Sequence, residues 1–221
     1  MTAAGQDSSA GREALESLCK KYWSPLYAFI RRSGKSPHDA EDLTQAFFGF
    51  IVKGDLLRKA TPERGRFRSF LLGSLKHFIA DAHDRANALK RGGRTEFVPL
   101  PLEGSYSAEP VDALSPEKLF ERRWAMTLLS QARKRLEDEY TAAGKASFYR
   151  ELSLFNAADA EAPSYAVTAA RLSIPENTLK SGVRRLRLRY RELLREEISQ
   201  TVDSPLEVDE EIQYLLSVLA N

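Results

Sequence analysis

Apolar residues recur at helical spacing along most of the chain, and this periodicity restricts its fold more than any other feature. In residues 67–82, apolar side chains return every three or four positions, which is the pattern of a helix with one buried face. No stretch shows the sustained alternation of apolar and polar residues that a half-buried strand requires. The sequence therefore predicts an all-α protein without a substantial sheet.

The first two helices have recognisable ends. A helix over residues 12–32 would stop near Gly34. The next would start at Ser36, which suits the N-cap, with Pro37 in the first helical position. Asp39 would complete a capping arrangement and place a negative charge near the positive end of the helix. We therefore expect a tight turn between two helices in this part of the chain.

One segment interrupts the helical pattern. Residues 93–115 contain several prolines and glycines, show no sustained period, and are long for a connection inside a compact domain. The sequence thus predicts two helical domains joined by a flexible acidic linker. The expected division is residues 1–92 for the first domain, 93–115 for the linker, 116–200 for the second domain, and 201–221 for an acidic, helical C-terminal extension.

Charge is segregated along the chain, although the formal net charge is only +2. Residues 58–94 hold ten basic and three acidic residues, a net charge of +7. Residues 95–117 hold five acidic and no basic residues, and residues 176–191 hold six basic residues against one acidic residue. Two separated basic segments indicate two contacts with a polyanion such as nucleic acid.

The second basic segment lies in a helix-turn-helix pattern. Residues 164–194 read as a short helix, a turn at residues 173–175, and a longer helix. Small Ala169 would allow the two helices to approach closely, and Leu179, Val183 and Leu186 would form the inner stripe of the longer helix. The side chains expected to reach base edges or phosphates are Asn177, Thr178, Lys180, Ser181, Arg184 and Arg185. A solvated basic helix in an ordinary bundle is the alternative interpretation.

Several function classes lack support in the residues. The chain has no phosphate-cradling GxxxxGK[ST] loop and no HExxH motif, and Cys19 is its one cysteine. His38, His77 and His83 form no evident metal-ligand pattern, so we expect no catalytic residue, no metal and no cofactor. Apolar runs are too short to span a bilayer, and no secretory segment is evident, so we expect no membrane insertion and a cytoplasmic location.

Three segments, taken in order, resemble one known family. They are DAEDLTQAFF at residues 39–48, ERGRFRSFLLGSLKHFIADAHDR at residues 63–85, and the helix-turn-helix segment. Over residues 13–194 the chain is similar to the extracytoplasmic-function sigma factors of bacterial RNA polymerase, which belong to the sigma-70 superfamily. The resemblance implies that the first domain is sigma region 2 and the second is sigma region 4.

The resemblance also assigns roles to residues. Core RNA polymerase would be bound by Asp39, Glu41, Asp42 and Gln45. The opened −10 region of promoter DNA would be bound by Arg58, Lys59, Arg64, Arg66, Arg68, Lys76, His77 and Arg85. The helix-turn-helix residues would bind the −35 region. Family members often carry Trp at Phe70, Asn at His77, Gly at Ser173 and Arg at Gly182, and these departures leave the promoter sequence open.

The function expected from the sequence is therefore that of a sigma factor, which is not an enzyme. It would recruit core polymerase to promoter DNA and hold the opened strand. Two alternatives stay open: a helix-turn-helix regulator that acts without joining polymerase, and an enzyme that processes nucleic acid. An anti-sigma or other regulatory protein is a further partner that the resemblance allows, and the C-terminal extension could hold such a regulator or pack on the second domain.

Overall fold

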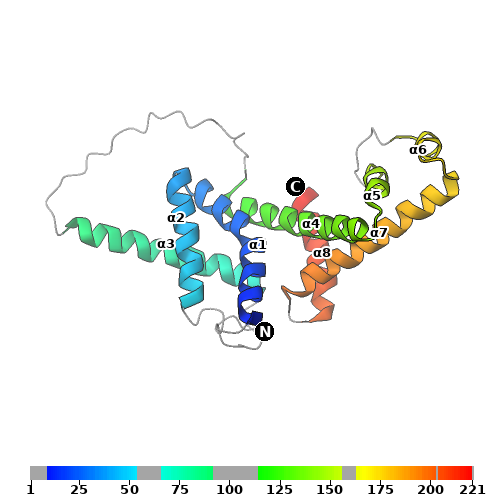
Figure 1. Ribbon diagram of the computed structural model, residues 1–221. Helices are drawn as coiled ribbons and strands as arrows, with labels where there is room; N and C mark the ends of the chain where they lie inside the picture. The colour runs from blue at the N-terminus through cyan, green and yellow to red at the C-terminus, as the bar shows by residue number, and fades with distance from the viewer. Residues whose placement is uncertain (1–8, 54–65, 92–113, 156–162, 203, 221) are drawn as a thin grey trace, which may run out of the picture. The chain divides into compact units, whose positions relative to one another are not determined.

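The computed structural model describes residues 9–53, 66–91, 114–155, 163–202 and 204–220, and all regular structure in these ranges is helical (Figure 1). The all-α prediction is confirmed for this part of the chain. The chain forms two compact units, residues 1–124 and residues 125–221. Of the expected linker, only residues 114 and 115 are described. In the described helices, none is long and apolar enough to cross a membrane.

Unit 1 is built from three helices and the beginning of a fourth. These are α1 (Ser9–Arg32), α2 (Pro37–Lys53), α3 (Phe67–Arg91) and the first turns of α4 (Pro116–Ala142). One face of each helix contributes to a common apolar core, as the periodicity predicts. Its fully buried large side chains are Tyr22, Leu26, Ile30, Phe47, Ile51, Leu71, Leu75, Phe120 and Trp124.

The predicted start of α2 is confirmed in atomic detail. The Asp39 backbone N–H donates to Ser36 Oγ at 3.1 Å, and the Ser36 hydroxyl donates to Asp39 Oδ2 at 2.7 Å. The Ser36 side chain thus satisfies a backbone N–H that the helix end leaves without an intrahelical partner, and the Asp39 carboxylate holds the Ser36 hydroxyl in place. The turn before it contains Gly34 at φ +90°, a backbone conformation that favours glycine.

Unit 2 contains the rest of α4 together with α5 (Ala146–Ser153), α6 (Tyr165–Leu172), α7 (Glu176–Ser199) and α8 (Pro205–Ala220). Helix α5 was not among the expected elements. Helix α4 ends where Gly144, at φ +70°, and Lys145 donate backbone hydrogen bonds to Thr141 and Tyr140. The glycine and the apolar spacing of the residues after it were the signals for α5, but eight residues make a weak periodic pattern.

The C-terminal extension is helical, as expected, and packs on α7. Val208 and Leu215 of α8 are buried, and Arg195 of α7 forms an ion pair with Asp209. The tail is therefore part of unit 2. Leu216, next to Leu215, is 60% exposed.

The first turns of α4 belong to unit 1. The second domain was expected to begin at residue 116, yet residues 116–124 belong to unit 1. Phe120 and Trp124 carry this association, because both are buried there. The helix itself begins at Pro116 as expected, after Ser115, whose Oγ accepts a hydrogen bond from the Lys118 N–H.

Candidate nucleic-acid interface

A helix-turn-helix is formed by α6, a short turn and α7 (Figure 1). Ser173 occupies the left-handed region, with φ 54° and ψ 41°. Its N–H donates to Ala170 O, and the Ile174 N–H donates to Ala169 O, both at 3.1 Å. This geometry ends α6 in the manner of a glycine cap although the residue is serine. The predicted turn at residues 173–175 is therefore confirmed.

The inner face of α7 fixes its position in unit 2. Leu179, Val183 and Leu186 are buried, as the sequence predicted, and Ala169 of α6 is buried too. Gly182 lies against α5: a Cβ placed there would lie 3.2 Å from atoms of both Phe148 and Leu152. The absence of a side chain at this position therefore permits the tight packing of α5 against α7.

The outer face of the N-terminal half of α7 carries the polar residues that the sequence singled out. The exposed side chains are Asn177, Thr178, Lys180, Ser181, Arg184 and Arg185. Lys180 Nζ lies 2.6 Å from Glu176 Oε1 and 5.7 Å from the centre of the Tyr165 ring. The hydrogen bond that Lys180 donates to Glu176 raises the pKa of Lys180. The structure thus brings all six predicted residues onto one stretch of helix.

The arginines of α7 fall into two groups. Farther along the helix, Arg187 donates to the Phe155 carbonyl, Arg189 pairs with Glu139, and Arg195 pairs with Asp209. By contrast, Arg184 and Arg185 form no ion pair with any carboxylate of the described residues. Positive charge is therefore left unbalanced on the exposed N-terminal half, where a nucleic acid would meet it.

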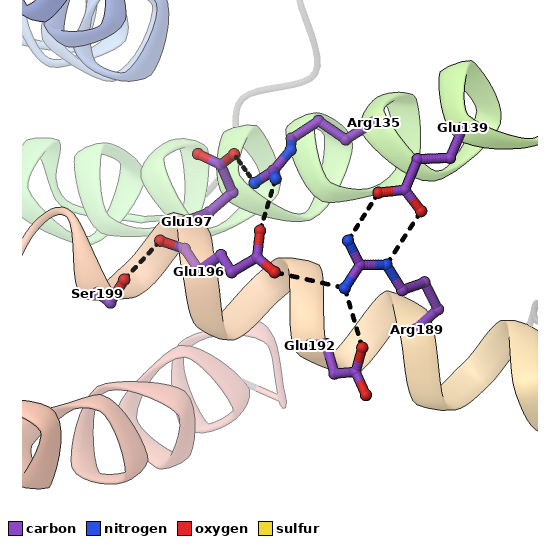
Figure 2. A network of polar contacts seen from close by, with 7 residues as sticks. All are labelled: Arg135, Glu139, Arg189, Glu192, Glu196, Glu197 and Ser199. Atoms are coloured by element: carbon purple, nitrogen blue, oxygen red, sulfur yellow. Dashed lines mark hydrogen bonds and ion pairs between the residues drawn. The ribbon is translucent and has the colours of Figure 1, made fainter. Parts of the chain in front are cut away.

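A network of ion pairs that includes Arg189 links α7 to α4, as Figure 2 shows. Arg135 bridges two carboxylates, with 2.6 Å to Glu196 and 2.9 Å to Glu197. Arg189 Nη2 lies 2.8 Å from Glu139 Oε1, and Nη1 lies 2.9 Å from Glu192 Oε2. The hydrogen bond from Arg189 lowers the pKa of Glu139. These charges support the scaffold, because each arginine is paired with carboxylates of unit 2.

The residues expected to hold the opened strand are only partly described. Arg58, Lys59 and Arg64 lie outside the described residues, as does the side chain of Arg85. On α3, Lys76 and His77 are exposed, and Lys76 Nζ lies 2.7 Å from Glu117 Oε1 of α4. Arg66, just before the helix, is half-buried.

Arg68 differs from its expected place. The side chain is 5% exposed, and its guanidinium carbon lies 4.8 Å from the centre of the buried Trp124 ring. A cation over the face of an indole is attracted by the ring quadrupole. Arg68 therefore packs inside unit 1 in this structure, whereas a contact to a DNA strand requires an exposed side chain. The sequence places Arg68 in a run of basic residues and gives no sign that Trp124 covers it.

Comparison with family models, with curated proteins and with solved structures finds no match for this chain. The interpretation of its surfaces consequently rests on their own geometry and charge.

The residues expected to bind polymerase gather on the outer side of α2. Asp39, Glu41, Asp42 and Gln45 are all exposed within the first turns of this helix. They are not equivalent, because Asp39 also caps the helix through Ser36, while Asp42 Oδ2 lies 3.0 Å from His38 Nδ1. Glu41 and Gln45 are one turn apart, so they lie on the same side of α2.

The described side chains hold no group of three or more His, Cys, Asp and Glu residues arranged to bind a metal ion. Of the three histidines, His38 and His83 lie beside a carboxylate, at 3.0 Å from Asp42 and 3.9 Å from Asp84. Each of these pairs is exposed on the outside of its own helix.

Proposed function

We propose that this protein is a sigma factor that directs bacterial core RNA polymerase to promoter DNA and helps to open it. One observation carries the proposal: the exposed half of α7 in a helix-turn-helix presents Arg184 and Arg185 without a carboxylate partner among the described side chains. Helices placed in this way read the major groove of duplex DNA with the residues near their N-terminus. The upstream promoter element is the duplex that α7 would read.

Two further surfaces, both on unit 1, support a role with polymerase. Unit 1 presents the acidic outer side of α2 and, on α3, the exposed side chains of Lys76 and His77. A regulator that only bound duplex DNA would not need these two surfaces. In a sigma factor, α2 would bind the polymerase and α3 would lie along the opened strand, so both surfaces receive a role.

The two DNA contacts would reinforce each other. Each is expected to be weak alone, because phosphate contacts are electrostatic and are screened by salt. When one unit is bound, the tether raises the effective concentration of the other near its own DNA element. The chain then makes and breaks no covalent bond: it positions the DNA, and phosphoryl transfer takes place in the polymerase.

A helix-turn-helix regulator that works without polymerase remains the second candidate, since the same α7 surface favours it. Titrating labelled full-length chain with bacterial core RNA polymerase separates the two functions. A sigma factor forms a stable complex with the core enzyme and binds promoter duplex poorly by itself. A regulator binds a preferred duplex sequence by itself and shows no affinity for the core enzyme.

A further inference from the structure

Residues 114–124 dock on α1 and α3 within unit 1. At one end, Arg32 Nε of α1 donates to the Leu114 carbonyl at 2.9 Å. At the other end, Trp124 is fully buried and lies against the Arg68 guanidinium. Phe120, one turn before Trp124, is 1% exposed. The start of α4 is thus held on unit 1 by contacts at both of its ends.

This docking brings Glu117 into contact with Lys76, a residue that the proposed function requires for binding the opened strand. Lys76 Nζ lies 2.7 Å from Glu117 Oε1, and 5.7 Å from the centre of the Phe29 ring. Both partners of the pair are about half exposed, at 47% and 46%. The hydrogen bond from Lys76 lowers the pKa of Glu117, so the carboxylate is charged whenever the pair is formed at neutral pH.

A carboxylate and a phosphate offer a lysine the same kind of partner, an anionic oxygen within hydrogen-bond distance. We propose that Glu117 occupies the position of a strand phosphate on Lys76, so that the start of α4 competes with single-stranded DNA for α3. The inference rests on the proposed role of α3 in holding the opened strand. Because residues 114–124 are docked, Glu117 acts as a tethered competitor with a high effective concentration.

The competition is weak enough to be reversed. A half-exposed ion pair gives little net stabilisation, since both charges lose part of their hydration and side-chain freedom when they meet. Rotation of the Glu117 side chain frees Lys76 while Phe120 and Trp124 stay buried. A strand supplied by an opening promoter can therefore displace Glu117, whereas a stray single strand that makes few other contacts is disfavoured.

The experiment measures binding of a short fluorescent single-stranded oligonucleotide to the full-length chain over a range of salt concentrations. The variant is Glu117→Gln, which removes the charge and keeps the shape. Glu121→Gln is the matched control, because Glu121 is one turn further along α4 and forms no ion pair in the described part of the chain. Lys76→Ala, alone and combined with Glu117→Gln, completes the set.

We expect Glu117→Gln to bind about two to five times more tightly than the parent, the factor that an exposed ion pair provides. The plot of log affinity against log salt should become steeper by up to about 0.7, the value for one added phosphate contact on a single strand. Glu121→Gln should show a smaller gain, and Glu117→Gln should give none when Lys76 is already alanine.

Folding is monitored in the same samples. Both tryptophans of the chain, Trp23 and Trp124, belong to unit 1, so their fluorescence reports whether the start of α4 is still docked. If the emission of Glu117→Gln is unchanged, the start of α4 is still docked, and an altered affinity for the oligonucleotide is due to the lost charge.

Two failures can be told apart. Equal gains in affinity for Glu117→Gln and Glu121→Gln would overturn the competition and leave the role of α3 intact. The same conclusion follows if Glu117→Gln gains no affinity although Lys76→Ala weakens binding. Absence of binding in the parent and in every variant would overturn both the competition and the strand-holding role.

Discussion

Arg189 of α7 grips Glu139 of α4 with two parallel hydrogen bonds, Nη2 to Oε1 at 2.8 Å and Nε to Oε2 at 3.0 Å (Figure 2). Two-point contacts of this kind fix both distance and angle between the side chains. The pair therefore helps to set how α7 lies on α4, and it uses for this contact one arginine of the basic segment 176–191.

Replacing Glu139 with Gln should lower the free energy of unfolding of unit 2 by about 0.5–1 kcal/mol at neutral pH. The loss is modest because the pair is more than one-third exposed and Arg189 keeps Glu192 as a partner. Urea unfolding followed by far-ultraviolet circular dichroism measures it. Glu137→Gln, an exposed change on the same helix, is the control and should change the stability by less.

The same pair predicts a pH dependence. The pKa of Glu139 is lower in the folded chain than its ordinary value, so the folded state holds the proton less tightly than the unfolded state. The stabilisation is complete above the ordinary pKa and is lost as the pH falls through the lowered one. The stability difference between parent and Glu139→Gln should thus shrink from about pH 5 downward. A difference that stays constant to pH 3 would contradict this account.

Ser173 predicts a stabilising substitution. A non-glycine residue in the left-handed region is strained, and Ser173 has φ 54°. Ser173→Gly should raise the free energy of unfolding by about 0.5–1 kcal/mol, as relief of this strain outweighs the added freedom of the unfolded chain. Ser130→Gly, in the middle of α4, should instead destabilise by about 0.5 kcal/mol. Thermal unfolding of both variants tests the opposite signs.

These elements show what a sequence can predict. The start of α2 and the turn at Ser173 depend on residues close together in the chain, so the local sequence predicts both features. Burial of Arg68 depends on Trp124, which is 56 positions away and reaches it only because residues 116–124 belong to unit 1. Which arginines of α7 form ion pairs and which stay exposed likewise depends on carboxylates of α4 and α8. Periodicity within one segment carries no information about such partners.

The exposed arginines of α7 should serve DNA and not stability. Arg184→Ala should change the free energy of unfolding by less than about 0.5 kcal/mol, since its side chain is exposed and has no carboxylate partner in the described structure. On promoter duplex, the plot of log affinity against log salt should become shallower by about 0.9 if Arg184 contacts one phosphate. Salt titration of the full chain measures this slope.

Leu179→Ala provides the contrast on the opposite face of the same helix. Leu179 is fully buried, so its truncation should cost about 2–5 kcal/mol of stability through lost burial and a new cavity. Urea unfolding of Leu179→Ala and Arg184→Ala side by side is the measurement.

If Arg184→Ala, Arg185→Ala and Lys180→Ala all bind DNA like the parent at every salt concentration, α7 does not read DNA.

The α2 surface predicts a separable loss of polymerase binding. Glu41→Lys combined with Gln45→Lys should weaken binding to core polymerase at least about tenfold, or roughly 1.4 kcal/mol, because it reverses the charge of an exposed face. Asp39 is left unchanged because it caps the helix through Ser36, and its loss would also destabilise α2. Glu137→Lys in unit 2, a charge reversal on an exposed helix face far from α2 in the sequence, is the control, and tryptophan fluorescence confirms that unit 1 is folded.

The central claim is tested most directly by transcription in a purified system. Bacterial core RNA polymerase is given a library of promoter fragments, with and without the full-length chain, and the starts of the RNA products are mapped. A sigma factor predicts discrete start sites that appear only when the chain is present, preceded by shared upstream and opened elements, and that weaken in Arg184→Ala. Transcripts that start at the same sites without the chain, or no chain-dependent start on any fragment, would contradict the proposed function.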